Sequence, residues 1–270
     1  MQQRRLVILS TIYDLKHMIQ TIKNHPPQAL STLLLIIPFF GKFNNYFHLF
    51  LKSCEYNPSI NWLIITDDDT PYNYPSNVKV RYMSFAELRQ KIQSNFDFPI
   101  SLPHPYKLCD YKPAYGYIFA EELKGFDFWG HCDNDLIFGD IRAFLTPDIF
   151  LKYDKILCKG HLSIFRNNEQ MNSFFMVNSN NAYKAVFETP FNVAFDEWGP
   201  VGILNVFNRL LSPESFWKSS CFDDPNALLH YFLPVGKESE QKTNIIYRFS
   251  YGKLMKLHTT TDGLHQTINE

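Results

Sequence analysis

Two continuous apolar runs near the start of the chain are typical of strands that are buried on both faces. Residues 33–37 are aliphatic and end at Pro38, and residues 61–66 form a second run. Between them, apolar residues recur at helical spacing from Phe43 to Cys54, and Pro58 ends that segment. Strand, helix and strand in this order predict a βαβ unit with parallel strands.

Short strands and helices continue to alternate along the rest of the chain. Residues 78–83 alternate like a strand, and Ser84 and Glu87 form a capping box for a helix that extends to residue 93. The proline-rich residues 97–113 are predicted to be a loop. This alternation is typical of an α/β protein. Later strands are predicted near residues 126–132, 155–158, 173–178 and 244–249, and helices at 114–123, 182–188 and 201–211. Residues 136–141 are predicted to be a short strand or turn, and Asp140 is predicted to cap a helix that begins near Arg142.

The segment from Phe126 to Arg142 holds the most informative chemistry. An aromatic strand ends in two carboxylates, Asp133 and Asp135, and an apolar segment follows at once. Ligands of open α/β sheets gather beyond the carboxyl ends of strands, and two carboxylates spaced i and i+2 can bind one hard divalent cation. The alternative is an Asx-type turn at the end of a strand.

Acids also follow the strand at residues 61–66. In nucleotide-binding α/β domains an acid near this position binds a ribose hydroxyl. Asp67 and Asp68 are therefore candidate donor-binding residues. A solvated turn is the alternative explanation for both.

A cluster of polar and aromatic residues lies just before the predicted helix at 114–123. Lys112 is a candidate phosphate clamp, and Asp110 is a candidate contact to a base or a ribose. The alternative is an Asp that caps the helix N-terminus beside a surface Lys.

Candidates from the second half of the chain complete the predicted site. His161 and Arg166 follow the strand at 155–158 and are both expected to point at the site. Asp196, Glu197 and Trp198 stand before an apolar helix. One interpretation is a general base for an incoming hydroxyl, with the Trp as a platform for the acceptor. The other is that carboxylates favour the N-terminal end of a helix dipole.

The amino-acid composition indicates which classes of protein fit the chain. The 270 residues are 45% hydrophobic and 20% charged with a formal net charge of −1, which indicates a globular protein and gives no general attraction to nucleic acid. Five scattered cysteines without a C-x-x-C predict neither a zinc knuckle nor a disulfide framework. No apolar run suits a membrane span or a signal peptide. We therefore expect a cytoplasmic protein.

Aromatic residues make up 16% of the chain, and we expect most of them in the core and a few as sugar platforms.

Four motifs in a fixed order resemble a known family. They read I-I-P-F-F-G-K at 36–42, K-L-C-D-Y-K-P-A-Y-G at 107–116, G-H-C-D-N-D-L-I-F-G-D at 130–140 and F-D-E-W at 195–198. Over about residues 33–210 the chain resembles the GT-A fold, DXD-containing bacterial glycosyltransferases of capsular and surface polysaccharide biosynthesis. The resemblance implies an α/β protein with a GT-A-like (Rossmann-like) three-layer α/β/α fold and a mostly parallel central sheet.

The resemblance also implies a division of the chain. Residues 1–30 would be an N-terminal extension, for which we identify no family counterpart. Residues 31–270 would form a single GT-A-like domain. Within it, residues 31–135 would be the nucleotide-sugar-binding half, and residues 136–270 the acceptor half and tail.

The function implied by the resemblance is metal-dependent transfer of a sugar from a nucleotide-sugar, most simply a UDP-sugar, to an oligosaccharide or lipid-linked saccharide acceptor. Asp133 and Asp135 would bind Mn²⁺ or Mg²⁺ that bridges the donor diphosphate. Asp110 and Lys112 match the segment against the nucleotide, and Asp196 and Glu197 match the acids near the acceptor. Such an enzyme is expected in the cytoplasm, where peripheral association with the inner face of the cell membrane would bring it to lipid-linked acceptors.

Besides the unmatched residues 1–30, a second feature departs from the family and keeps other classes open. A late His often completes the metal shell in such enzymes, whereas this tail offers only His258 and His265, in no matching motif. A non-catalytic carbohydrate-binding protein or decayed transferase would keep the aromatic residues and lose nucleotide affinity. A metal-dependent phosphohydrolase would also use clustered acids, but it normally needs more metal ligands than this chain shows.

Overall fold

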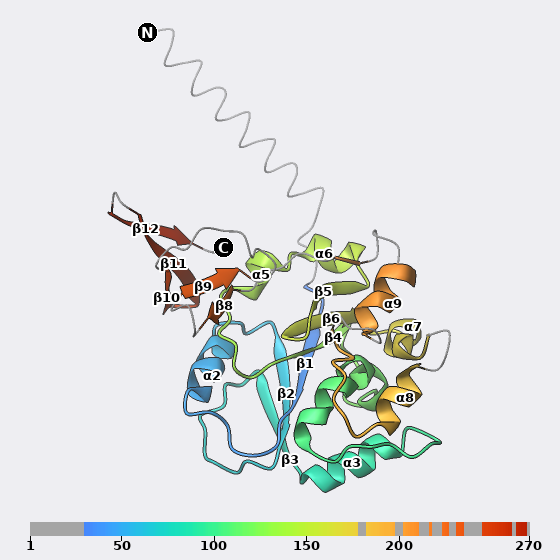
Figure 1. Ribbon diagram of the computed structural model, residues 1–270. Coiled ribbons are helices and arrows are strands. Elements are labelled where there is room, and N and C mark those ends of the chain that lie inside the picture. Colours follow the sequence, from blue (N-terminus) through green and yellow to red (C-terminus); the bar gives the residue numbers. More distant parts are fainter. Residues whose placement is uncertain are drawn as a thin grey trace, which may run out of the picture. The chain divides into compact units, whose positions relative to one another are not determined.

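A computed structural model of the chain (Figure 1) describes residues 30–177, 182–197, 202–210, 216–217, 223–226, 231–234, 245–260 and 263–268. The chain divides into two compact units, Met1–Leu30 and Ser31–Glu270. No helix in the described ranges is both long enough and apolar enough to cross a membrane.

The second unit is built on a seven-stranded sheet with the order β3-β2-β1-β4-β6-β5-β7. All neighbouring strands are parallel except that β6 runs antiparallel to both β4 and β5. The sheet is therefore mostly parallel, as predicted. Its strands are β1 (Leu33–Pro38), β2 (Asn61–Thr66), β3 (Val78–Tyr82), β4 (Phe128–Cys132), β5 (Lys155–Lys159), β6 (Leu162–Arg166) and β7 (Phe216–Trp217).

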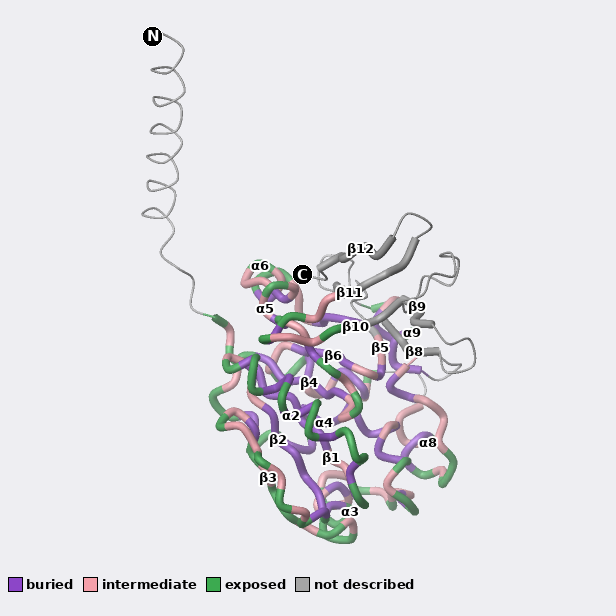
Figure 2. The backbone as a smooth tube through the Cα atoms, turned by 90° about the vertical axis from the view of Figure 1, so that its left-hand side faces the viewer, coloured by how far each residue is buried: buried purple, intermediate pink, exposed green. Residues whose placement is uncertain are grey.

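Continuous apolar sequence explains why the central strands are buried on both faces (Figure 2). Because side chains alternate across a strand, β1 divides between two cores. Leu34 and Ile36 belong to one hydrophobic cluster, and Leu33, Leu35 and Ile37 belong to the other. The sheet is thus the middle layer of three.

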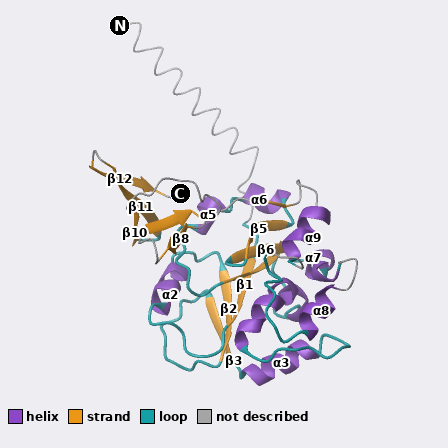
Figure 3. Ribbon diagram, in the orientation of Figure 1, coloured by secondary structure: helices purple, strands orange, loops and turns teal. Residues whose placement is uncertain are grey.

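Helices cover both faces of the sheet. The cluster around Leu35 takes side chains from α2 (Phe47–Glu55), α5 (Ile141–Phe144) and α6 (Pro147–Lys152). Figure 3 shows α2 on one side of the strands and α3 (Phe85–Gln93) and α8 (Ala182–Glu188) on the other. This arrangement confirms the predicted fold class, a mixed α/β protein with a mostly parallel central sheet, and is consistent with the GT-A-like type. The cluster around Ile36 takes side chains from α3 (Phe85–Gln93), the 3-10 helix η1 (Pro105–Ala114), α4 (Tyr115–Ile118), α7 (Glu169–Asn172), the 3-10 helix η2 (Phe174–Met176), α8 (Ala182–Glu188) and α9 (Ile203–Leu210).

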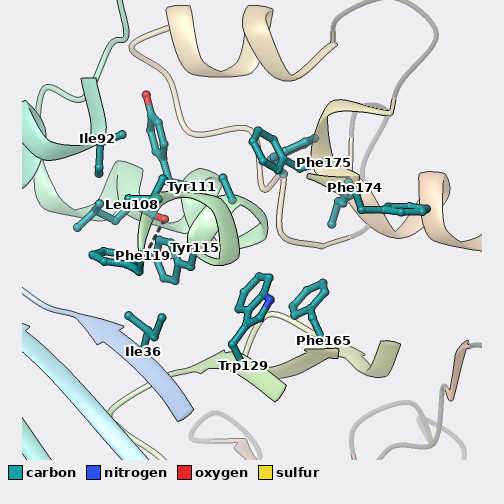
Figure 4. Close-up of a cluster of buried hydrophobic side chains, with 14 of the residues drawn as sticks. Ile36, Ile92, Leu108, Tyr111, Tyr115, Phe119, Trp129, Phe165, Phe174 and Phe175 are labelled. Carbon is teal, nitrogen blue, oxygen red and sulfur yellow. Dashed lines mark hydrogen bonds between the residues drawn. The ribbon is translucent and has the colours of Figure 1, made fainter. Parts of the chain in front are cut away.

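Aromatic rings fill much of the core around Ile36 (Figure 4). Trp129 and Phe165 stack across β4 and β6 with their centroids 4.2 Å apart. Tyr111 of η1 stacks on Phe187 of α8, also at 4.2 Å. The high aromatic content of the chain therefore serves packing between the sheet and this helical layer, as the sequence predicts for most of these residues.

Two smaller sheets come from the C-terminal part. One is the antiparallel sheet of β10 (Ile245–Ser250), β11 (Lys253–Thr260) and β12 (Gly263–Ile268). The other pairs β8 (Asp223–Asn226) with β9 (Tyr231–Pro234). The ring of Phe249 in β10 packs edge-on against Tyr56, which follows α2, at 5.6 Å. The strand predicted at 244–249 is confirmed as β10.

Several predicted elements differ from the structure. The loop predicted at 97–113 contains η1, and the helix predicted at 114–123 is helical only as α4. The strand predicted at 173–178 is wrong, because residues 174–176 form η2. A short apolar run does not distinguish a strand from a buried helical turn. Residues 136–140 form no strand, and Asp140 caps α5 as predicted by accepting the N–H groups of Arg142 and Ala143.

Gly116 in α4 tests how tightly this core is packed. A Cβ atom at this position would come 2.4 Å from the buried Trp129 ring. Glycine to alanine in a helix normally stabilises by about 1 kcal/mol, whereas overpacking a core costs about 1–3 kcal/mol. We therefore expect Gly116→Ala to lower the free energy of unfolding by about 1–2 kcal/mol in urea titrations. Gly139→Ala is the matched control, since its Cβ would meet nothing closer than 3.4 Å; equal effects of the two variants would contradict this packing.

Candidate active site

The candidate site lies at the edge where the parallel strands end. Asp133 directly follows β4, and the acids at 67–69 follow β2. Because β6 is antiparallel, it begins at this same edge, and Cys132 pairs with Leu162 in the ladder. The backbone N–H of Asp133 donates to the carbonyl of His161 at 3.0 Å. The topology thus places Asp133 and His161 side by side, although they are far apart in sequence.

A lysine joins Asp133 to the aspartate of the F-D-E-W motif. Lys112 Nζ lies 2.8 Å from Asp133 Oδ1 and 3.3 Å from Asp196 Oδ2. It also donates to the carbonyl of Gly160 at 3.1 Å. His161 Nδ1 lies 3.2 Å from the second carboxylate oxygen of Asp133. We name this group, completed by Glu197, the Lys112 cluster: Lys112, Asp133, Gly160, His161, Asp196 and Glu197.

Gly160 closes the cluster from the turn between β5 and β6. Its N–H donates to Glu197 Oε1 at 3.0 Å. A Cβ atom at this position would come 2.6 Å from Glu197 Oε1 and 2.9 Å from Asp196 Oδ2. Two carboxylates therefore approach the backbone at a distance that only glycine permits.

The three buried charges of the cluster have displaced pKa values. Burial alone would raise the pKa of Asp133, but the hydrogen bond from His161 and the charge of Lys112 lower it to about 2. Burial raises the pKa of Asp196 to about 6 despite the opposing effect of Lys112. Burial would lower the pKa of the Lys112 ammonium, yet the two carboxylates raise it above its ordinary value. At neutral pH two carboxylates thus share one ammonium group, and Asp196 is the one that takes up a proton first.

The cluster is buried on one side and open on the other. The side chains of Lys112 and Asp196 are only 11% and 6% exposed, whereas those of Asp133 and His161 are 31% and 40% exposed. Hydrogen bonding to Asp133 raises the pKa of His161. Asp135, two residues beyond Asp133, is exposed. A ligand can therefore reach Asp133, Asp135 and His161 from solvent, while Lys112 and Asp196 form the floor.

The structure does not bring Asp110 to this opening. Its carboxylate is fully buried, lies 2.7 Å from Lys107 Nζ and accepts the backbone N–H groups of Val193 and Phe195. No surface is left for a base or a ribose. The prediction that Asp110 contacts the nucleotide is therefore corrected to a structural role.

Arg166 is also separate from the cluster. It pairs with Phe128, the first residue of β4, whereas Asp133 follows the last residue of that strand. Its guanidinium lies 2.5 Å from Asp154 and donates to the carbonyl of Phe150. The prediction that Arg166 faces the donor is corrected, because a residue at this end of an antiparallel strand cannot reach the opposite edge.

Asp67 and Asp68 form a second polar group at the same edge, next to β1. Asp67 accepts the N–H of Gly41 at 2.7 Å. Asp68 is buried, accepts the N–H of Phe43 and lies 2.7 Å from Lys42 Nζ. Burial would raise the pKa of Asp68, but Lys42 and its other hydrogen bonds lower it. Asp68 therefore fastens the loop that follows β1, and of the two acids Asp67 is the more accessible to a ligand.

Some predicted residues fall outside what the structure describes. Trp198 is one of them. The ladder pairs the backbones of His258 and His265 across β11 and β12, but their side chains also lie outside the described part. Among the described residues no group of three His, Cys, Asp or Glu side chains gathers as a metal site. Asp133 and Asp135 thus offer two carboxylates, whose oxygens suit a hard cation, and further ligands would have to come from elsewhere.

The sequence pattern does not single out Gly160 or Lys107 as site residues. Gly160 stands between two strands, and a lone glycine there normally signals only a turn. Lys107 belongs to the motif that supplied Asp110 and Lys112, but nothing in its spacing shows that it is buried. Only the fold shows that Gly160 binds Glu197 and that Lys107 binds Asp110 and two backbone carbonyls.

Comparisons with known proteins give a family and structural likenesses. A family model described as "Family of unknown function (DUF6625)" matches residues 35–268. A search of curated proteins gives no match. The crystal structure of mouse xyloside xylosyltransferase 1 in its apo form is similar with a TM-score of 0.38 and 12% sequence identity, over 71% of this chain and 85% of that chain.

Proposed function

Because the chain belongs to the family of unknown function DUF6625, whose description names no activity, we propose a function from the site itself. The protein is a glycosyltransferase that moves a sugar from a nucleotide-sugar donor to a saccharide acceptor. One observation carries the proposal: Lys112 joins the strand-end acid Asp133 to Asp196, and Gly160 holds the neighbouring Glu197, within a cluster that is open to solvent on one side. A donor diphosphate and an acceptor hydroxyl would meet over such a cluster.

The donor side consists of Lys112, Asp133 and Asp135. The exposed Asp135 and the half-buried Asp133 would hold Mn²⁺ or Mg²⁺ through carboxylate oxygens, which such hard cations prefer. When bound, the cation would neutralise charge on the departing nucleoside diphosphate. Lys112 adds a positive charge beneath the same position and offsets part of the repulsion between the two nearby carboxylates and the diphosphate.

The acceptor side consists of Glu197, Asp196 and His161, with Trp198 proposed as a sugar platform. The bond between the anomeric carbon and the diphosphate oxygen breaks, and the acceptor oxygen forms the new bond to that carbon. The acceptor proton passes to a carboxylate. Glu197 is the better placed of the two acids, because it is only partly buried and its Oε1 is fixed by the N–H of Gly160. Asp196 sits deeper against Lys112 and sets the charge of the floor.

The family resemblance of the four motifs supports a UDP-sugar as the donor and an oligosaccharide or a lipid-linked saccharide as the acceptor. It also supports a role in capsule or lipopolysaccharide biosynthesis. The matching location is the cytoplasm, with peripheral association at the inner face of the cell membrane.

The test is the release of nucleoside diphosphate from a panel of UDP- and GDP-sugars, with Mn²⁺ and with or without saccharide acceptors. We expect release with at least one donor, and none above background with Asp133→Asn. Turnover of p-nitrophenyl phosphate without any donor turnover would favour a phosphohydrolase instead. Binding of saccharides without either activity would favour a carbohydrate-binding protein.

Gly160→Ala is expected to change the positions of Asp196 and Glu197, and hence turnover, with little change in stability. The new methyl group meets the ends of two flexible carboxylates rather than backbone, so we expect a change in the free energy of unfolding of only about 1 kcal/mol or less. Glu197 and Asp196 must move away, and turnover is expected to fall by about tenfold or more. Parallel donor-turnover and urea-unfolding assays on Gly160→Ala and the control Gly139→Ala check this. Full activity in Gly160→Ala would show that the positions of the two acids do not matter.

A further inference from the structure

A buried ion pair in η1 lies one turn before Lys112. Lys107 Nζ and Asp110 Oδ2 are 2.7 Å apart, and both side chains are completely buried. The ammonium also donates to the carbonyl of Val186 at 2.9 Å and to that of Phe191 at 2.6 Å. Its three N–H groups therefore have three acceptors, two of them in the segment that leads to Asp196.

The carboxylate of Asp110 holds the same segment further along. Asp110 accepts the N–H of Val193 at 3.0 Å and the N–H of Phe195 at 2.8 Å. These two amides flank Ala194, whose φ of 53° lies in the left-handed region that non-glycine residues disfavour. A residue keeps such a conformation only where its surroundings enforce it. Asp110 thus fixes the kink in the backbone immediately before Asp196.

The kink determines where the two acids point. Beyond Ala194 the chain turns so that Asp196 meets Lys112 and Glu197 meets the N–H of Gly160. Lys107, Asp110 and Lys112 all belong to η1. This one short helix therefore binds both the backbone that precedes the two acids and the carboxylate of Asp196. Stability alone does not explain a buried ion pair, because apolar residues of similar volume often serve as well.

We propose that the Lys107–Asp110 ion pair is a positioning device that holds Asp196 and Glu197 in the Lys112 cluster. Lys107 and Asp110 are positioning residues, since neither reaches the open side of the cluster. The consequence for sugar transfer rests on the proposed function, but the hold on the acids does not. It has its own reporter: the amide of Gly160, which donates to Glu197 and belongs to another element.

The experiment compares amide hydrogen exchange by NMR in the wild type, Asp110→Asn and Lys107→Met/Asp110→Asn. The amide of Ile36, in the centre of β1, reports global unfolding in each variant. We expect the ratio of the Gly160 rate to the Ile36 rate to rise about tenfold in the double variant. Asp110→Asn keeps a side-chain oxygen for Val193 and Phe195 but leaves the buried Lys107 ammonium without its carboxylate, so it is also expected to raise the ratio and serves as the second variant should the double variant not fold.

The control is Lys52→Met/Glu55→Gln on α2. Lys52 and Glu55 have the same i, i+3 spacing and lie 2.6 Å apart, but both are exposed. The ratio is expected to stay unchanged in this control. An unchanged ratio in the Lys107 and Asp110 variants would overturn the positioning role.

Donor turnover of the same proteins separates the two proposals. A raised Gly160 ratio in proteins whose wild type turns over no nucleotide-sugar would leave the positioning role standing and remove the proposed function. In an active wild type, we expect turnover to fall by about tenfold in the double variant while the KM for the donor stays within about twofold. A change in KM alone would overturn the assignment to the acceptor side.

Discussion

Replacing Lys112 with methionine is expected to lower the free energy of unfolding by about 3–5 kcal/mol at pH 8. The ammonium lies within 3.3 Å of two carboxylates and is itself almost buried. Without it, Asp133 and Asp196 repel each other in a poorly solvated site, and the carbonyl of Gly160 loses a donor. Removing one member of a buried charge network leaves the remaining charges uncompensated, which is why the effect exceeds that of an ordinary surface change.

The loss in Lys112→Met is expected to shrink as the pH falls from 8 to 5. The fold raises the pKa of Asp196 to about 6 from an ordinary value near 3.8. A raised carboxylate pKa favours the protonated group in the folded state, so this stabilisation is present at low pH and disappears as the pH rises through 6. Protonating Asp196 also removes its repulsion with Asp133. Urea unfolding at pH 5 and pH 8 measures both values.

Lys52→Met provides the control for this prediction, since Lys52 pairs with Glu55 at 2.6 Å on the surface of α2. Exposed pairs contribute about 0–1 kcal/mol. An equal loss in Lys112→Met and Lys52→Met, or a loss in Lys112→Met that does not depend on pH, would contradict the charge balance inferred for the cluster.

Glu197→Gln is expected to lower turnover by about 10²–10⁴-fold, the usual contribution of a general base. Glutamine has the same shape and can still accept the N–H of Gly160, so the fold and the donor contacts of Asp133 should survive. The KM for the donor should therefore stay within about twofold, because the interaction lost belongs to the transition state. Steady-state kinetics against the best donor and acceptor measure both quantities.

Asp196→Asn is the comparison for this prediction. It removes a charge from the floor of the site without removing Glu197. A larger loss of turnover in Asp196→Asn than in Glu197→Gln would reverse the roles given to the two acids. Unchanged turnover in Glu197→Gln would remove Glu197 from the mechanism.

Elements with a strong local signal were predictable from sequence. The apolar runs at 33–38 and 61–66 became β1 and β2, and the capping box at Ser84 and Glu87 begins α3 as predicted. η1 was not predictable, because its prolines read as a loop. In the structure Pro105 begins that helix, and the segment is stabilised by burying Lys107 and Asp110 against a segment some 80 residues away.

The predicted site also contains residues with a clear local signal and residues whose role depends on tertiary contacts. Asp133 stood out because it follows a strand, and the fold brings Lys112, His161, Asp196 and Glu197 to it. Asp110 and Arg166 were assigned wrongly because sequence shows that a residue is charged but not which partner it meets. Their partners, Lys107 with the backbone at 193–195 and Asp154, are set by tertiary contacts alone.

Calorimetric titration with UDP, GDP and CMP, with Mn²⁺ and then with EDTA, is the most direct test of a metal-dependent donor site at the end of β4. Asp135 is exposed, so Asp135→Ala should change stability by no more than about 0.5 kcal/mol and serves as a folded comparison. We expect one nucleotide to bind the wild type with Mn²⁺, and we expect this binding to disappear with EDTA and in Asp135→Ala. Absence of binding by every nucleotide, or binding that neither EDTA nor Asp135→Ala affects, would contradict a donor site at the end of β4.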